Sequence, residues 1–243
     1  KDTSYLNDDN TLTIEISIYE GDQYRFRNIS FVGNTVYSNE RLHKILSIKS
    51  GDIFDKSILD AQIYGNPNGG DISSLYLDDG YLFFNVNLIE TAVENNQIDL
   101  EIRIYEGQQA KINKVTVNGN IKTNDHVIMR EIRTKPGDLF SRSDIIRTQR
   151  ELAQLSYFNP ESLGNIDINP DAIRNTVDIN YTVEEVSSDK INLQGGWGAG
   201  RVIGQLGLEF NNFSFKNIAN FKKWDPLPSG DGQRLILSAS SNG

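Results

Sequence analysis

An internal repeat of 86 residues constrains the fold more than any other feature of this sequence. Residues 96–107 (NQIDLEIRIYEG) nearly copy residues 10–21 (NTLTIEISIYEG). A third copy of this strand occurs at residues 175–185. A Gly-Asn pair and a Lys-x-Gly-Asp turn also repeat at the same separation, as Gly33-Asn34 and Gly119-Asn120, and as residues 49–54 and 135–140. Such a period predicts tandem copies of one small unit.

Each copy predicts the order β-α-α-β-β, an α+β fold in which two helices pack on a three-stranded sheet. The first strand alternates and stops at the Gly-Asn pair, and the second helix follows the Gly-Asp turn. In the earlier copy the glycine-rich residues 65–70 interrupt that helix, and we expect a loop there. In the earlier copy we expect the first strand at residues 24–32, the first helix at 39–46 and the closing strands at 83–90 and 98–105. In the later copy we expect the same elements at residues 110–117, 125–132, 164–168 and 176–183.

These motifs resemble the POTRA domains of the BamA-type outer-membrane assembly superfamily. The resemblance depends on the order of the Phe31-Val-Gly-Asn34 and Val117-Asn-Gly-Asn120 segments, the Gly-Asp turns, the Ser156-Tyr-Phe-Asn-Pro160 segment and the Tyr-Glu-Gly strand ends. It implies the final strand of a preceding POTRA domain at residues 1–21, and complete POTRA domains at 22–107 and 108–186. The chain starts at Lys1 without a leader sequence, so we expect a piece of a longer protein.

After residue 186 glycine becomes frequent and helical periodicity disappears. Apolar residues alternate with small or polar ones over residues 190–198, 203–211 and 234–241, with a turn near Gly200. Alternating segments of roughly 10 residues are typical of transmembrane β-strands. We therefore predict that residues 187–243 are the first antiparallel strands of an incomplete outer-membrane β-barrel. The alternative is a hairpin that completes a third small soluble domain.

The resemblance implies a protein that binds unfolded outer-membrane proteins and accessory assembly lipoproteins, in contact with outer-membrane lipid. The middle strand of each unit is expected at the sheet edge, where β-augmentation is possible. The first strand of the barrel would be a weakly paired templating edge. The predicted edge-strand contacts are Phe83, Phe84, Val86, Leu88, Ile166 and Ile168, and the predicted templating residues are Ile191, Leu193, Gly195, Gly196 and Gly198. Alternation also allows many of these side chains to face a core instead.

Residues 129–133 (MREIR) resemble the part of the last POTRA domain that contacts a partner lipoprotein, with Glu131 at the centre. The alternative for this segment is a solvated charged helix end. Related families with the same architecture are translocation-assembly proteins and two-partner secretion transporters. A soluble periplasmic scaffold of repeated α+β modules is a further alternative.

The composition argues against other function classes. The net charge of −9 and the pI near 4.8 provide no basic stripe for nucleic acid. Cysteine is absent, and His43 and His126 lie at similar places in the short helices of the two units, whereas a metal or acid–base site would need several converging ligands. We therefore expect no enzyme, no metal and no cofactor. The resemblance implies the outer membrane of a Gram-negative bacterium, with the POTRA domains in the periplasm.

Overall fold

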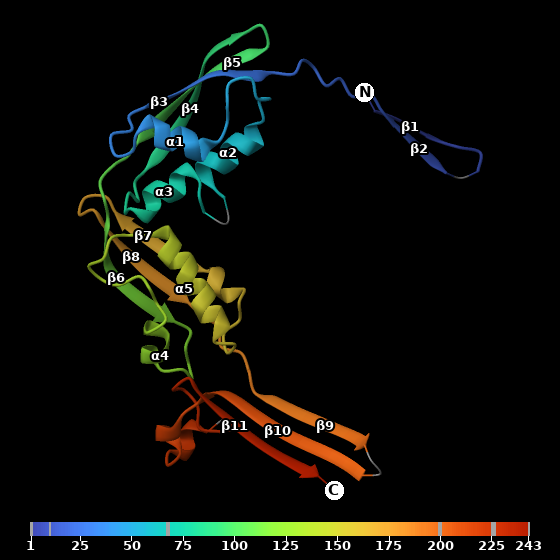
Figure 1. Cartoon of the computed structure of the whole chain (residues 1–243), viewed down its shortest axis with the longest axis vertical. Helices are drawn as coiled ribbons and strands as arrows, with labels where there is room; N and C mark the ends of the chain where they lie inside the picture. Colours follow the sequence, from blue (N-terminus) through green and yellow to red (C-terminus); the bar gives the residue numbers. More distant parts are fainter. Residues whose placement is uncertain (1, 10, 67–68, 199–200, 225–226, 243) are drawn as a thin grey trace.

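The computed structural model describes all residues except 1, 10, 67–68, 199–200, 225–226 and 243. An N-terminal hairpin is followed by two units, each with one strand, two or three α-helices and then two strands, and by a C-terminal sheet (Figure 1). The strands are β1 (Asp2–Leu6), β2 (Leu12–Ile16), β3 (Arg25–Val32), β4 (Asn85–Glu94), β5 (Gln97–Tyr105), β6 (Lys111–Asn118), β7 (Ile166–Asp171), β8 (Thr176–Thr182), β9 (Lys190–Gly198), β10 (Arg201–Phe213) and β11 (Gln233–Asn242). The α-helices are α1 (Asn39–Leu46), α2 (Lys56–Tyr64), α3 (Ile72–Asp78), α4 (Asp125–Met129) and α5 (Arg142–Gln154), and short 3₁₀ turns cover Ser162–Gly164, Phe215–Asn217 and Phe221–Lys223.

The two units have the same sheet topology. The strand orders are β3-β5-β4 and β6-β8-β7, with the first strand parallel and the middle strand in sequence antiparallel to the central one. Helices cover one face of each sheet (Figure 1). The alternation of β5 explains this arrangement, because Leu100, Ile102 and Ile104 are at most 4% exposed and belong to the first core.

The expected break in the second helix of the earlier unit is confirmed. Helix α2 ends at Tyr64 and α3 begins at Ile72, and residues 67–68 of the intervening loop lie outside the described residues. Asp71 is fully buried and caps α3, accepting hydrogen bonds from the backbone N–H and the hydroxyl of Ser74. The first helix of the later unit is shorter than predicted. Helix α4 ends at Met129, because residues 130–131 form a turn in which the Glu131 N–H donates to the Ile128 carbonyl.

The repeated Gly-Asn pairs have a steric explanation. Gly33 and Gly119 have φ values of +90° and +94°, a region that L side chains rarely adopt. A Cβ atom would lie 2.2 Å from the Ile104 carbonyl oxygen at Gly33 and 1.9 Å from the Val183 carbonyl oxygen at Gly119. The first strand therefore leaves the sheet here through a turn that requires glycine.

The two units contact each other directly. The Ala110 N–H donates to the Gly80 carbonyl, and the Ser143 N–H donates to Asp78 Oδ1, both at 2.7 to 2.8 Å. Arg142 also donates to Ser74 Oγ at 3.0 Å. The bonds of Ser143 and Arg142 join α3 of the earlier unit to the start of α5 in the later one. The two units are therefore held together by these contacts as well as by the short linker at residues 108–109.

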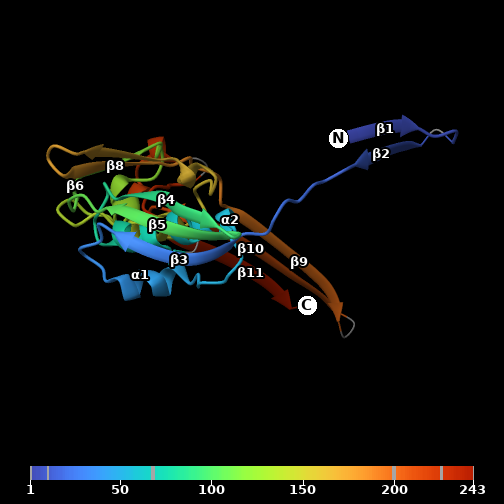
Figure 2. The same cartoon turned by 90° about the horizontal axis from the view of Figure 1, so that it is seen from above.

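The N-terminal segment forms two strands, whereas the sequence predicted one strand for residues 1–21. The pairs Asp2↔Ile16 and Ser4↔Ile14 of the β1–β2 hairpin lie 86 residues before the pairs Leu88↔Ile102 and Glu90↔Leu100 of β4 and β5. The hairpin therefore repeats the register of the closing strands of the next unit. It projects away from the rest of the molecule (Figure 2).

The C-terminal segment forms strands over all three predicted ranges. The order is β11-β10-β9, antiparallel throughout, and leaves β9 at a sheet edge. The turn predicted near Gly200 lies outside the described residues. Among the described residues, no helix combines the length and apolar character needed to cross a bilayer.

Candidate functional site: sheet edges and the junction with the C-terminal sheet

Strands β4, β7 and β9 each lie at the edge of a sheet, as the sequence predicted for the middle strands and for the first strand after residue 186. An edge strand has N–H and C=O groups on one side that no strand of the same sheet pairs. Asn87 on β4 and Ile168 on β7 are exposed beside these edges, Ile168 to 39%. Strands β3, β6 and β11 form the opposite edges of the same three sheets. Strands β4, β7 and β9 are therefore among the places in the described structure where an extended chain can add by β-augmentation.

Several predicted contact residues lie elsewhere. Phe83 and Phe84 precede β4, so their prediction as strand residues was wrong. The Phe84 ring stacks on Tyr76 with a centroid distance of 4.3 Å. Val86 is 2% exposed and belongs to the core, and Leu88 and Ile166 are half-buried against the two cores.

The structure explains the Tyr-Glu-Gly strand ends. The Glu106 carboxylate accepts the backbone N–H groups of Thr35 and Val36 at 2.8 and 2.9 Å, and also the Thr35 hydroxyl and the Tyr76 phenol. Burial raises the pKa of Glu106, but these hydrogen bonds outweigh burial, so the net pKa lies below the usual value. Glu106 therefore ties the end of β5 to the turn that follows Gly33.

Glu185 makes the same connection in the later unit. Its carboxylate accepts three consecutive backbone N–H groups, from Ile121, Lys122 and Thr123, at 3.1, 2.8 and 2.6 Å. This bond set fixes the loop between β6 and α4. The same loop contacts the C-terminal sheet, so Glu185 supports that contact indirectly.

Five polar residues join the later unit to the C-terminal sheet, and we call them the junction cluster: Thr123, Asn124, Asn212, Ser214 and Asp231. Asp231 is 7% exposed and accepts hydrogen bonds from the Asn124 amide at 2.9 Å and the Ser214 hydroxyl at 2.7 Å. The Asn212 amide donates to the Thr123 hydroxyl at 2.8 Å. The two side-chain bonds of this cluster that cross the junction connect residues 107 and 89 positions apart, and the sequence did not reveal them.

The charge of Asp231 is favoured at the junction. The hydrogen bond from Ser214 is the main reason that the pKa of the Asp231 carboxyl is lowered, and the bond from Asn124 and nearby Lys216 and His126 act in the same direction against burial. His126 Nε2 lies 3.8 Å from Asp231 Oδ1.

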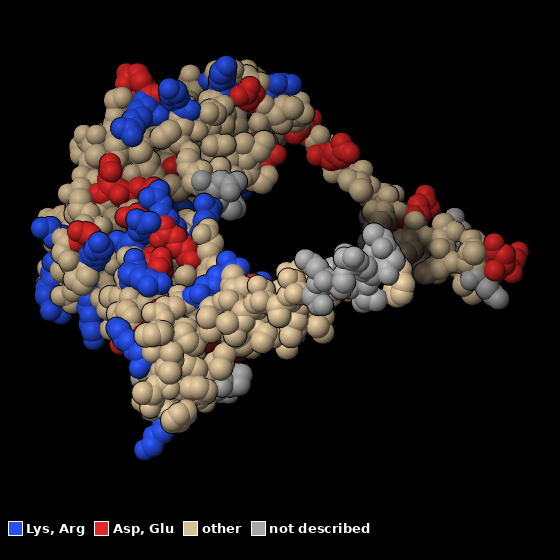
Figure 3. Space-filling view, turned by 60° about the horizontal axis from the view of Figure 1, so that its bottom comes forward, with Lys and Arg blue, Asp and Glu red and all other residues tan. Residues whose placement is uncertain are grey.

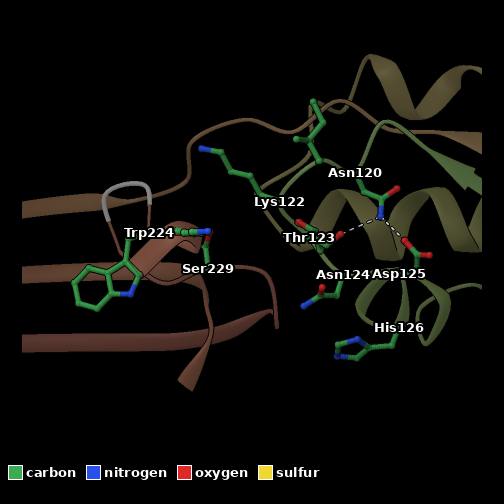
Figure 4. A pocket seen from close by; sticks show the side chains of 10 residues that line it. Asn120, Lys122, Thr123, Asn124, Asp125, His126, Trp224 and Ser229 are labelled. Carbon is green, nitrogen blue, oxygen red and sulfur yellow. Dashed lines mark hydrogen bonds between the residues drawn. The ribbon is translucent and has the colours of Figure 1, made fainter. Parts of the chain in front are cut away.

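Backbone contacts at the junction leave no room for side chains. Gly230 accepts from the Asn124 N–H at 2.9 Å, and a Cβ on Gly230 would lie 2.5 Å from the Lys122 carbonyl oxygen. A Cβ on Gly232 would lie 2.7 Å from Val127 Cγ1. A cleft of about 600 Å³ opens beside this contact, between the loop before α4 and the connection that carries Trp224 (Figure 4).

The C-terminal sheet has one apolar and one polar face. Cross-strand partners share a face of a sheet, and the partners Leu193↔Leu206, Ile191↔Leu208 and Leu208↔Leu237 form an apolar face. Ile191 and Leu193 are 71% and 77% exposed. Gly195, Gly196 and Gly198 lie in the same edge strand. The opposite face is more polar, and on it Arg234 pairs with Glu209 at 2.8 Å, although it also carries Ile236, the cross-strand partner of Glu209, which is 54% exposed.

The remaining predicted residues have local partners. Glu131 lies in the turn after α4, and its carboxylate accepts from Arg130 at 2.8 Å with 28% of its side chain exposed. The His43 ring packs edge-on against Phe31 at 4.9 Å. Within the described residues, no group of three or more His, Asp or Glu side chains is placed to hold a metal ion.

Comparison with known proteins identifies related sequences over most of the chain. A family model described as POTRA, surface antigen variable number repeat, matches residues 24–107 and 110–186. The chain is 29% identical over 183 residues to a putative outer membrane protein assembly factor of Treponema pallidum, covering 75% of this chain and 21% of the relative. It is 26% identical over 196 residues to the outer membrane protein assembly factor BamA of Neisseria meningitidis, covering 79% and 23%. The chain thus spans about a fifth of the length of these relatives.

Solved structures show a similar fold. BamA from Haemophilus ducreyi lacking POTRA domains 1–3 aligns with a TM-score of 0.66 and 21% identity, over 90% of this chain and 37% of that one. POTRA domains 3–5 of BamA from Haemophilus influenzae align with a TM-score of 0.59 and 23% identity, over 76% and 71%. The first alignment reaches beyond the length of the two matched repeats.

Proposed function

The chain belongs to the POTRA family, and from this premise we propose that it is the client-binding periplasmic arm and the start of the membrane barrel of an outer-membrane protein assembly factor. The names of the relatives from Treponema and Neisseria support this role. The single observation that carries it is that β4, β7 and β9 each lie at an edge of one of three successive sheets of one chain. We place the protein in the outer membrane of a Gram-negative bacterium, with its POTRA domains in the periplasm.

We propose four parts for the chain: the end of a preceding POTRA domain at residues 1–21, POTRA domains at 22–107 and 108–186, and the first barrel strands at 187–243. The register shared by the β1–β2 and β4–β5 hairpins supports the first part. The two separate cores support the second and third. For the last part, the support is the contrast between the apolar and polar faces of the β9–β11 sheet, since a barrel strand faces lipid on one side and the lumen on the other.

Unfolded outer-membrane proteins would bind by adding a strand to β4 or β7. Backbone pairing tolerates many client sequences, because the bonds are made by groups that every residue except proline carries. Ile168 and Asn87 would contact the added strand, whereas the buried Val86 supports the edge from the core. Strand β9, with Ile191, Leu193 and its glycines, would present a templating edge to a client strand in the membrane.

Accessory lipoproteins would bind the later unit beside Glu131. In the described structure this carboxylate pairs with Arg130 in the same turn. A partner would therefore have to compete for this ion pair or extend it. Translocation-assembly and two-partner secretion are alternative functions for the same architecture. They differ from outer-membrane protein assembly in whether the client stays in the membrane.

Photo-crosslinking in cells tests client binding, with a photoreactive residue at Asn87, Ile168 or Leu193 of the full-length protein. A matched control is Ile58, an isoleucine that is 53% exposed on helix α2 and belongs to no strand. We expect adducts with nascent outer-membrane proteins at the three edge positions and few at Ile58. Equal labelling at all four positions would contradict edge binding. Adducts with a secreted protein would favour a transporter.

A further inference from the structure

The connection between β10 and β11 exposes unusually many aromatic side chains. We call residues 215–224 the aromatic loop. Phe215 is 71% exposed, Phe221 is 76% exposed and Trp224 is 36% exposed, and Ile218 between them is 41% exposed. Loops in contact with water are usually polar, and clustered exposed apolar groups indicate a surface that another phase or molecule covers.

The aromatic loop is held in a defined conformation. Ser214 is fully buried, and its hydroxyl accepts from the Asn217 N–H at 3.2 Å. The Trp224 indole N–H donates to the Asn217 carbonyl at 3.2 Å, and the Phe221 and Trp224 rings lie 5.2 Å apart. The rings are therefore exposed although hydrogen bonds and a ring contact within the loop fix its conformation.

Positive charge accompanies the aromatic side chains. Lys216 and Lys222 are both exposed in the same loop. The whole chain has a net charge of −9, yet from residue 187 onward six Lys or Arg residues stand against four Asp or Glu residues. In Figure 3 the lower part of the molecule is largely uncharged, with a basic side chain projecting from it. Aromatic rings interleaved with lysines are typical of segments that lie among anionic lipid headgroups.

The position of the aromatic loop fits the same surface. The aromatic loop follows the end of β10. At this end of the sheet β9 begins, with Lys190 opposite Glu209 in the strand register. At this end the sheet meets the later unit through the junction cluster. Figure 4 shows Trp224 of the aromatic loop across the neighbouring cleft from Thr123 and Asn124. If the apolar face of the sheet lies in hydrocarbon, the aromatic loop lies at the level of the periplasmic headgroups.

We propose that the aromatic loop is an interface anchor, in which Phe215 and Phe221 insert among the headgroups of anionic phospholipids and Lys216 and Lys222 contact their phosphates. The anchor fixes the depth of the first strands, and the junction cluster transmits this position to the later unit. The inference rests on the proposed function, because it requires the C-terminal sheet to lie in a membrane.

Spin-label accessibility tests the anchor in the full-length protein, reconstituted in vesicles of phosphatidylethanolamine and phosphatidylglycerol. Nitroxides are attached at Phe221→Cys, at Leu206→Cys on the apolar face, and at Ile121→Cys, which is 92% exposed on the later unit. Collisions with oxygen report lipid, and collisions with a water-soluble nickel chelate report water. We expect position 206 to read as hydrocarbon, 121 as water, and 221 as intermediate, with a chelate collision rate several-fold below that at 121.

The outcomes separate the two proposals. If 221 matches 121 while 206 reads hydrocarbon, the anchor is wrong and the barrel stands. If 206 reads water, the barrel assignment fails, and the anchor fails with it. Low collision rates with both reagents at 221 mean that a protein covers the loop, which also overturns the anchor.

A charge variant provides an independent measurement. In Lys216→Gln/Lys222→Gln, we expect the chelate collision rate at 221 to rise toward the rate at 121. The rise should be large in vesicles with phosphatidylglycerol and small in vesicles without it, because the lysines act on anionic headgroups. An equal rate in both kinds of vesicle would exclude the electrostatic part of the anchor.

Discussion

The junction cluster predicts that Asp231→Ala loosens the later unit from the C-terminal sheet. The substitution removes the acceptor for the Asn124 amide and for the hydroxyl of the fully buried Ser214. Losing a hydrogen bond to a charged group costs roughly 1.5–3 kcal/mol. Of these two bonds only the one from Asn124 crosses the junction, so we expect docking to be weakened by roughly 1.5–3 kcal/mol. A change of this size reduces the ratio of docked to undocked units roughly tenfold to a hundredfold.

Distance measurement between two spin labels checks this prediction. The described chain contains no cysteine, so labels at Ile173→Cys, 95% exposed on the later unit, and Ser238→Cys on β11 report across the junction. We expect one narrow distance distribution in the parent protein and a broad one in Asp231→Ala. The control is Glu151→Ala, which removes an ion pair with Arg133 inside the later unit. A distribution in Asp231→Ala as narrow as in the parent would refute the reasoning that these bonds hold the junction.

Three further predictions concern stability, each measured by urea denaturation followed by circular dichroism. Glu106→Gln should lower the free energy of unfolding by roughly 1.5–3 kcal/mol at pH 7. Because the folded pKa of Glu106 is depressed, the stability that its charge contributes is present above the unfolded pKa and is lost as the pH falls through the folded pKa. The parent and the variant should therefore converge in stability in acid. Tyr157→Phe should leave stability unchanged or raised, since the Tyr157 hydroxyl is buried without a partner among the described residues. Tyr181→Phe should cost about 1 kcal/mol, because the Tyr181 hydroxyl bonds to a buried threonine at 2.8 Å. Equal effects of the two substitutions would contradict the view that only the Tyr181 hydroxyl is hydrogen-bonded. Gly119→Ala should destabilise the protein clearly more than Gly137→Ala. The two glycines have similar φ values of +94° and +96°, but a Cβ would collide with a carbonyl oxygen only at position 119. Equal costs would mean that backbone strain alone determines the loss of stability.

The sequence predicted several strand ranges and helix ends well, because their signals are local. Strand β9 spans Lys190–Gly198, the range that alternation predicted, and the break between α2 and α3 follows from glycines that disfavour helix. The strand prediction at Phe83 and Phe84 was wrong, because an apolar run does not reveal whether its aromatic side chains lie in a strand or in the turn before it. There, contact with Tyr76 on α3 decides the conformation.

The candidate site was harder to predict, because its partners are distant in the sequence. Asp231 meets Asn124 across 107 residues, and neither residue belongs to a repeated motif. Burial also divides residues that alternation treats alike: Val86 is 2% exposed in the core, and Ile168 is 39% exposed beside an edge. Alternation assigns residues to two faces of a strand, but the helices that cover one face determine which face becomes available to a partner.

The N-terminal hairpin shows what those helices contribute. Ile14, Ile16 and Ile18 are 60%, 62% and 77% exposed, while Leu100 and Ile102, which follow the first two by 86 residues, are 3% and 0% exposed. Fully burying such a side chain is worth about 1.5–3 kcal/mol, and a two-stranded hairpin by itself is marginally stable at best in water. The β1–β2 hairpin therefore depends on a covering layer equivalent to α1–α3. This requirement supports the proposal that residues 1–21 end a preceding POTRA domain, since the helices of such a domain would supply that layer.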